Sequence, residues 1–126
     1  MRKRNVILIV DDELELCKVL QKTLKKEGYH VLIATTGQKA LSLLKKEKVD
    51  LLLLDLKMPL ISGLELLKKI RKTVPEGKKK STIPAVILTA YGSLSSAQEA
   101  MALGAVEYLT KPFDLKEVIT VVKEAL

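Results

Sequence analysis

VDLLLLDLKMP, residues 49–59, is the stretch of sequence that decides the fold. Its leucines run without interruption into Asp55, and Asp50 and Pro59 bound the run. A continuous apolar run of this length is typical of a strand that is buried on both faces of a sheet. Asp55 is then the first residue to emerge at the carboxyl end of that strand. Because ligands of open α/β sheets bind beyond the carboxyl ends of strands, Asp55 is a better candidate for a functional residue than for an ordinary surface carboxylate.

Apolar patterns on both sides of this stretch predict five strands that alternate with five helices. The strands are expected at residues 5–10, 29–34, 51–54, 83–89 and 105–110. The helices are expected at residues 13–27, 35–46, 63–73, 93–103 and from 114 onward. Such alternation implies one parallel sheet with helices on both faces, so we expect a doubly wound, flavodoxin-like α/β fold with strand order 2-1-3-4-5. Residues 1–126 contain no linker or repeat and are expected to form a single domain.

Length and composition indicate a globular domain with a proper core. Hydrophobic residues make up 48% of the 126 residues and charged residues 29%, and no apolar run approaches the roughly 20 residues of a membrane span. The apolar segment 6–10 is too short for a signal peptide and is followed by two aspartates. Cys17 is the single cysteine and is expected to be a small buried helix residue, which excludes an internal disulfide and favours the reducing cytoplasm.

The net charge of +7 raises the question of nucleic-acid binding. The basic residues are mostly lysines, scattered over several expected helix faces, with one cluster at Lys78–Lys80. The sequence contains no helix-turn-helix, zinc-finger or RNA-binding aromatic motif. We therefore expect this domain to bind no nucleic acid directly and no membrane.

Polar residues stand at the carboxyl ends of four expected strands. The first strand leads to Asp11 and Asp12, the third to Asp55, the fourth ends at Thr89, and the fifth leads to Lys111. Strands 1 and 3 flank the point where the strand order reverses, so the three carboxylates should share one crevice. Carboxylates that close together repel one another, and a divalent cation relieves that repulsion. Hard oxygen ligands select Mg²⁺ or Ca²⁺, and the preference of Mg²⁺ for phosphate oxygens points to phosphoryl chemistry.

The nucleophile that this site offers is a carboxylate. The chain has no P-loop and no G-x-G-x-x-G motif, so nucleotide binding has no support, and it has no Ser/His/Asp arrangement. Aspartate is a known acceptor of phosphoryl groups as an aspartyl phosphate. Taken alone, Thr89 could be a strand-end cap and Lys111 a solvated loop residue. Both readings are ordinary, but their coincidence with three carboxylates at one sheet edge is improbable.

These residues resemble the receiver domain of two-component response regulators from end to end. The matching segments are VDD (10–12), LLLDLKMP (52–59) followed by SG (62–63), LTAYG (88–92) and YLTKPF (108–113). The sequence is most similar to receivers attached to transcription activators of the nitrogen-regulation type.

The resemblance implies roles at the site. Asp55 would be the phosphoacceptor, with Thr89 and Lys111 beside the phosphoryl group. The Mg²⁺ ligands would be Asp11, Asp12, Asp55 and the backbone carbonyl of Lys57.

The resemblance also implies roles outside the acidic pocket. Thr89 and Tyr108 would be the switch pair, and the peptide bond before Pro112 would be cis. Lys57 and Tyr91 would flank the route of an attacking water and tune the lifetime of the phosphorylated form. The chain departs from the family at Leu60-Ile61, where Gly-Met is frequent, and in a longer loop at residues 76–80.

The expected function is a phosphorylation-activated switch. A sensor histidine kinase or a phosphotransfer protein would donate a phosphoryl group from phosphohistidine to Asp55, and the domain would assist its own phosphorylation and dephosphorylation without being a free-standing enzyme. The expected output surface is the face of the fourth helix, fifth strand and fifth helix, with an apolar patch at Ala97, Ala100 and Met101. That face is the family's usual homodimer surface, and a C-terminal effector domain absent from this chain is the other partner that the resemblance allows.

Two rival functions share parts of this pattern. A flavodoxin-like FMN domain has the same strand order but needs a hydroxyl- and Gly-rich phosphate loop after the first strand, where this chain has Asp11-Asp12. An Asp-nucleophile phosphatase needs a second Asp two residues after the nucleophile, where this chain has Lys57. A yellow protein, or steady turnover of phosphate monoesters, would favour the respective rival.

Overall fold

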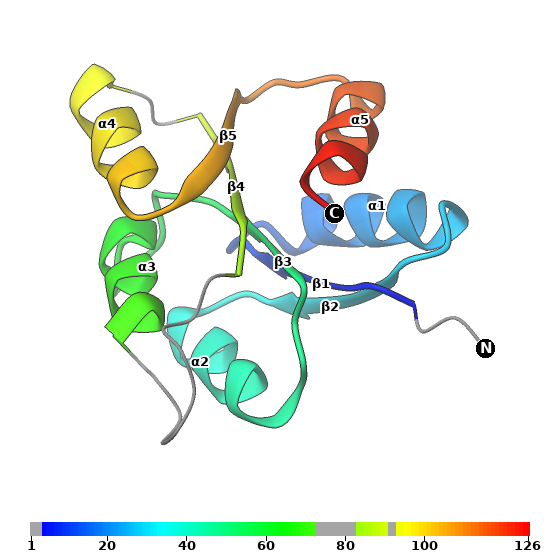
Figure 1. Cartoon of the computed structure of the whole chain (residues 1–126), viewed down its shortest axis with the longest axis horizontal. Helices are drawn as coiled ribbons and strands as arrows, with labels where there is room; N and C mark the ends of the chain where they lie inside the picture. The colour runs from blue at the N-terminus through cyan, green and yellow to red at the C-terminus, as the bar shows by residue number, and fades with distance from the viewer. Residues whose placement is uncertain (1–3, 73–82, 91–92) are drawn as a thin grey trace.

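The computed structural model describes residues 4–72, 83–90 and 93–126. Its centre is a five-stranded parallel sheet with the order β2-β1-β3-β4-β5, the predicted doubly wound arrangement (Figure 1). The strands are β1 Val6–Val10, β2 His30–Ala34, β3 Leu51–Leu54, β4 Ala85–Thr89 and β5 Ala105–Thr110. The helices are α1 Leu14–Lys26, α2 Gly37–Lys46, α3 Gly63–Lys72, α4 Leu94–Ala102 and α5 Leu115–Ala125.

The helices form two layers. Figure 1 shows α1 and α5 on one face of the sheet and α2, α3 and α4 on the other. Each leucine of β3 is buried: Leu52 and Leu54 belong to the core cluster under α2–α4, and Leu51 and Leu53 to the cluster under α1 and α5. The unbroken apolar run of β3 therefore has a physical cause, because a strand covered on both faces has no solvent-facing side for polar residues.

Capping residues set most of the helix boundaries. The Thr36 side chain accepts a hydrogen bond from the backbone N–H of Lys39, so α2 begins at Gly37, two residues after the predicted start. The predicted capping box of Asp114 and Glu117 is present at α5. Gly28 adopts φ +97° just beyond α1, where the left-handed conformation ends the helix.

The edge strand β5 departs from the predicted alternation, in which Val106 and Tyr108 share a side. A register shift lies between the pairs Ala85–Ala105 and Val86–Glu107, so Val106 is an extra residue that is 51% exposed. After the shift Tyr108 pairs with Ile87 and Thr110 with Thr89. Tyr108 packs against the core cluster under α2–α4.

The apolar patch predicted on α4 is wrong in one member. Ala100 is fully buried in the core cluster under α2–α4, whereas Met101 is exposed and Ala97 is half-buried. A small side chain at position 100 faces the sheet, and the exposed apolar residues of this region are instead Leu94, Met101 and Val106.

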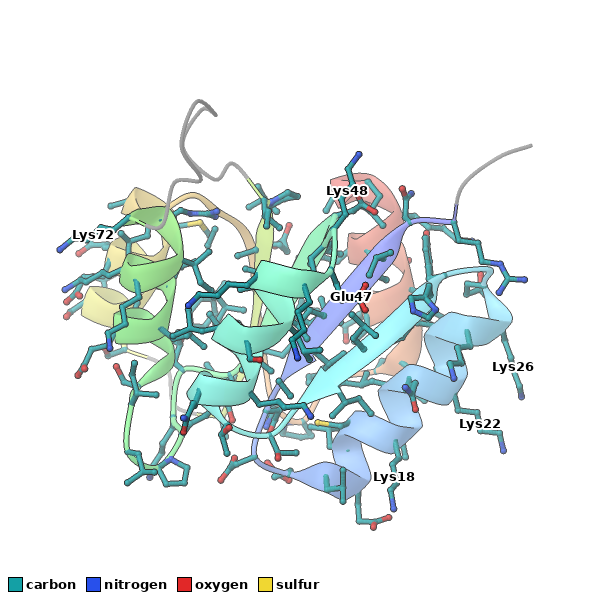
Figure 2. The ribbon with its side chains drawn as sticks, turned by 90° about the horizontal axis from the view of Figure 1, so that it is seen from below. Lys18, Lys22, Lys26, Glu47, Lys48 and Lys72 are labelled. Atoms are coloured by element: carbon teal, nitrogen blue, oxygen red, sulfur yellow. The ribbon has the colours of Figure 1, made fainter. Side chains whose placement is uncertain are left out.

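The lysines project from several elements. Figure 2 shows Lys18, Lys22 and Lys26 pointing away from α1, with Lys48 before β3 and Lys72 at the end of α3. These side chains are exposed and distributed as the sequence suggested. Among the described residues, no helix combines the length and apolar character that crossing a membrane requires.

Leu60, in the loop after β3, adopts a left-handed backbone conformation with φ 72° while its side chain is fully exposed. That conformation costs a residue with a Cβ roughly 1–2 kcal/mol, which a glycine at this position would not pay. Glycine also loses more conformational entropy on folding, which cancels about 0.5–1 kcal/mol of this gain. We expect Leu60→Gly to raise the free energy of unfolding by about 0.5–1 kcal/mol, measured by urea denaturation.

Leu60→Ala is the matched control, because alanine removes the exposed side chain but keeps the Cβ that causes the strain. It should not reproduce the gain in stability. Equal stability of the glycine and alanine variants would show that φ at position 60 carries no strain.

Candidate functional site

The acidic residues meet at the carboxyl edge of the sheet. Asp55 follows β3 and its backbone N–H donates to the carbonyl of Val10, while Asp11 and Asp12 follow β1 directly. Carboxylate oxygens of Asp11, Asp12 and Asp55 lie within 4.8 Å of one another. Asp11 and Asp55 are buried and Asp12 is exposed. The strand order therefore brings the three predicted carboxylates into one crevice.

A cavity of about 400 Å³ opens beside these carboxylates. Its lining comes from the ends of β1, β3, β4 and β5 and consists of Asp12, Glu13, Asp55, Lys57, Met58, Pro59, Thr89, Ala90 and Lys111. Thr89 is fully buried at the end of β4. The structure thus brings the predicted phosphoacceptor, hydroxyl and ammonium to one cavity.

Lys111 reaches three carboxylates. Its Nζ lies 2.8 Å from Asp11 Oδ2, 2.9 Å from Glu13 Oε1 and 3.3 Å from Asp55 Oδ2, and the side chain is 13% exposed. Burial alone would lower the pKa of Lys111, but the hydrogen bonds to Asp11 and Glu13 and the charges of Asp11 and Asp55 outweigh it, so the pKa is raised. Lys111 therefore stays positively charged in the lining of the cavity.

Asp11 has the opposite balance. Burial raises the pKa of its carboxyl, and the hydrogen bonds from Lys111 and from the backbone N–H of Glu13 oppose that rise without cancelling it. A second positive charge beside Asp11 would favour its ionised form. A cation bound beside Asp11 and Asp12 would therefore stabilise the ionised form of these carboxylates.

The Asp55 side chain is held at both oxygens. Oδ1 accepts from the backbone N–H of Lys57 at 3.1 Å, and Oδ2 accepts from Lys111 Nζ. Gly63 packs so closely on the backbone of Asp55 and Leu56 that an added Cβ would overlap the carbonyl oxygen of Asp55. Gly63 N–H also donates to the carbonyl of Leu56 at 2.8 Å, which ties the start of α3 to the segment that carries Asp55.

Glu13 and Gly63 make close contacts at the site but had no assigned role in the sequence interpretation. Glu13 lines the cavity and contacts Lys111, and the run Asp11-Asp12-Glu13 was the signal that could have identified it. Gly63 stood in the quoted SG segment, but only the structure shows the close approach that excludes a side chain.

The other predicted positions have mixed outcomes. The Lys111–Pro112 peptide bond is cis, as expected. Cys17 is buried in α1 as predicted, where its Sγ contacts the carbonyl of Asp11 at 3.3 Å and burial raises its pKa to about 11. Tyr91 and the loop at 76–80 lie outside the described residues.

The model of the response regulator receiver domain family matches residues 7–123. The chain belongs to this family. The receiver domain is 42% identical over 120 residues to the sporulation initiation phosphotransferase F of Bacillus subtilis (strain 168), covering 95% of this chain and 92% of that protein. It is 39% identical over 120 residues to the transcriptional regulatory protein ZraR of Klebsiella oxytoca, covering 95% of this chain but 26% of that protein.

Solved structures agree with the family match. A CheY-like response regulator receiver domain from Methanospirillum hungatei JF-1 superposes with a TM-score of 0.87 at 32% identity, covering 97% of this receiver domain and 93% of that chain. The response regulator TrrA of Thermotoga maritima, solved in complex with Mg²⁺-BeF, has a TM-score of 0.81 at 38% identity, covering 97% and 99% respectively. These matches support the receiver interpretation over the FMN-binding and phosphatase alternatives.

The donor set of this receiver domain fits a divalent cation. Asp11, Asp12 and Asp55 supply hard oxygens from two adjacent strands, and Asp12 is open to the cavity. Mg²⁺ characteristically takes one or two carboxylates and keeps several waters, which a partly exposed site of this kind allows.

Proposed function

We propose that this receiver domain is a phosphorylation-activated switch of a two-component system. Asp55 accepts the phosphoryl group from a phosphohistidine of a sensor histidine kinase or a phosphotransfer protein in the cytoplasm. The observation that carries this proposal is the placement of Asp55, buried at the wall of an open cavity with Lys111 on one side-chain oxygen and the Lys57 N–H on the other.

The residues fit an in-line phosphoryl transfer. A carboxylate oxygen of Asp55 forms the new O–P bond as the N–P bond of phosphohistidine breaks, and the bonding electrons return to the imidazole nitrogen. Lys111 stabilises the negative charge on the phosphoryl oxygens. Asp11, Asp12, Asp55 and the Lys57 carbonyl would hold Mg²⁺, which would supply further charge neutralisation.

The same residues act when the phosphoryl group leaves to water, so the domain assists both steps without being a free-standing enzyme. Lys57 lines the cavity next to Asp55, where a long side chain limits the approach of water. Tyr91 is proposed for the same role from the sequence alone. Together they would tune the lifetime of the phosphorylated form.

The signal leaves the site through Thr89 and Tyr108. An aspartyl phosphate brings about two negative charges and new acceptor oxygens, which attract the Thr89 hydroxyl. Tyr108 pairs with Ile87, which lies two residues before Thr89 on β4, so Tyr108 is on the same face of the sheet as Thr89. Its side chain is half-buried against the core. Movement of Thr89 leaves space that Tyr108 can enter by rotating inward, and the phosphorylated form selects that conformation.

The output surface is the face of α4, β5 and α5, whose exposed apolar residues include Leu94, Met101 and Val106. This surface would contact a second copy of the domain or an effector domain. The chain spans 26% of ZraR from Klebsiella oxytoca and 49% of the transcriptional regulatory protein CpxR from Klebsiella pneumoniae. Both of these relatives therefore contain sequence beyond the part that matches this domain.

The test is phosphorylation by a small-molecule donor. Incubation with acetyl phosphate and Mg²⁺ is expected to add the mass of a single phosphoryl group, measured by intact-protein mass spectrometry. The adduct should be lost in base and in hydroxylamine, as an acyl phosphate is, and chelation of Mg²⁺ should prevent its formation. A hydroxylamine-resistant adduct, or one that forms without divalent cation, would contradict the proposal.

A further inference from the structure

Lys111 donates hydrogen bonds both to carboxylates of the candidate metal site and to a carboxylate outside it. An ammonium has three N–H donors, and Lys111 Nζ lies within 3.3 Å of oxygens from Asp11, Glu13 and Asp55. Asp11 and Asp55 belong to the three-carboxylate group that fits a metal ion, and Glu13 does not. Glu13 is therefore the partner that Lys111 can keep when the other two oxygens are needed elsewhere.

The local structure of Glu13 directs its side chain to Lys111. Glu13 occupies the N-cap position of α1, yet its side chain makes no capping hydrogen bond. Its backbone is fixed from both sides, because its N–H donates to Asp11 Oδ1 at 2.9 Å and its carbonyl accepts from Cys17 at 3.0 Å. Residues with short polar side chains normally occupy this position to stabilise the helix, so helix capping does not explain a glutamate here.

We propose that Glu13 is a positioning residue that holds the Lys111 ammonium and thereby sets the Mg²⁺ affinity of the acidic site. This inference rests on the proposed function. Mg²⁺ and Lys111 compete for oxygens of Asp11 and Asp55, and Glu13 gives the ammonium a carboxylate that the metal does not use. Without that carboxylate Lys111 engages Asp11 and Asp55 more firmly, and the metal must displace it.

The expected effect is modest, because the Glu13 side chain is 62% exposed and solvent screens its charge. Glu13→Gln should weaken Mg²⁺ binding by about two- to fivefold, in line with exposed ion pairs. The matched control is Glu15→Gln, which removes the same charge two residues later from a side chain that is 91% exposed and lies 3.8 Å from Lys18. That variant should bind Mg²⁺ like the wild type in titration calorimetry.

A double-mutant cycle separates positioning from simple attraction between Glu13 and the metal. In a Lys111→Met background, Glu13→Gln should have no further effect on Mg²⁺ affinity, because the ammonium through which Glu13 acts has been removed. Persistence of the full effect in that background would overturn the inference. Mg²⁺ affinity that is unchanged by Glu13→Gln in the wild-type background would overturn it as well.

A second measurement needs no Lys111 variant and covers the case in which Lys111→Met does not fold. The side-chain ammonium resonance of Lys111, observed by ¹⁵N NMR, should shift in Glu13→Gln and stay in place in Glu15→Gln. An unmoved resonance in Glu13→Gln would overturn the inference. Wild-type protein that binds no Mg²⁺ would overturn both this inference and the proposed function, whereas normal binding with independent effects of Glu13 and Lys111 would overturn this inference alone.

Discussion

Asp55→Asn is expected to abolish incorporation of a phosphoryl group from acetyl phosphate. An amide oxygen is a far weaker nucleophile than a carboxylate, and the amide cannot form the acyl phosphate that the mechanism requires. Asparagine has nearly the same shape, and its carbonyl oxygen can still accept the Lys57 N–H that binds Asp55 at 3.1 Å. The loss should therefore appear with the fold intact, checked by circular dichroism.

Asp50→Asn is the matched control, since it makes the same substitution beside the other end of β3. Asp50 Oδ2 accepts from the backbone N–H of Val6 at 2.8 Å, and an asparagine oxygen can take over that structural contact. This variant should be phosphorylated like the wild type. A phosphoryl adduct that persists in Asp55→Asn, or one that maps to a serine or threonine by peptide mass spectrometry, would contradict the mechanism.

The parts of the fold that follow from local rules could be predicted from the sequence. The apolar run before Asp55 has no polar face, and only a central strand between two helix layers accommodates such a run. The cap at Asp114 and the glycine stop at Gly28 are likewise set by residues adjacent in the chain. Once the strand order was inferred, the convergence of Asp11, Asp12 and Asp55 followed from topology.

Features that depend on distant partners were missed or misjudged. The register shift in β5 is defined by the pairing of Ala105 and Glu107 with β4, and the local alternation of polarity contains no sign of it. Alanine is common both in cores and on surfaces, so the residue type alone does not predict that Ala100 faces the sheet. Glu13 contacts Lys111, a lysine 98 residues away in the sequence, and only the folded arrangement reveals that contact.

Asp12→Ala is expected to weaken Mg²⁺ binding by at least about tenfold. A hydrogen bond or ligand contact to a charged group is worth roughly 1.5–3 kcal/mol, which corresponds to about a ten- to 150-fold change in affinity. Asp12 is the best of the three carboxylates for isolating the metal-binding role because it is exposed. Asp11 also binds Lys111 and the Glu13 N–H, and Asp55 also binds the Lys57 N–H, so alanine substitutions there would remove structural hydrogen bonds as well as a metal ligand.

Titration calorimetry at constant ionic strength measures the effect, because salt screens the general attraction between the cation and exposed charges. Glu99→Ala is the control: it removes an exposed carboxylate from α4 and should leave the Mg²⁺ affinity unchanged. A small decrease shared by both variants would indicate long-range attraction alone, with no ligand role for Asp12. A large decrease confined to Asp12→Ala would indicate direct ligation, since Asp12 shares the crevice with Asp11 and Asp55 whereas Glu99 lies on α4. Equal affinity in wild type and Asp12→Ala would remove Asp12 from the metal site and would contradict its proposed role as a ligand.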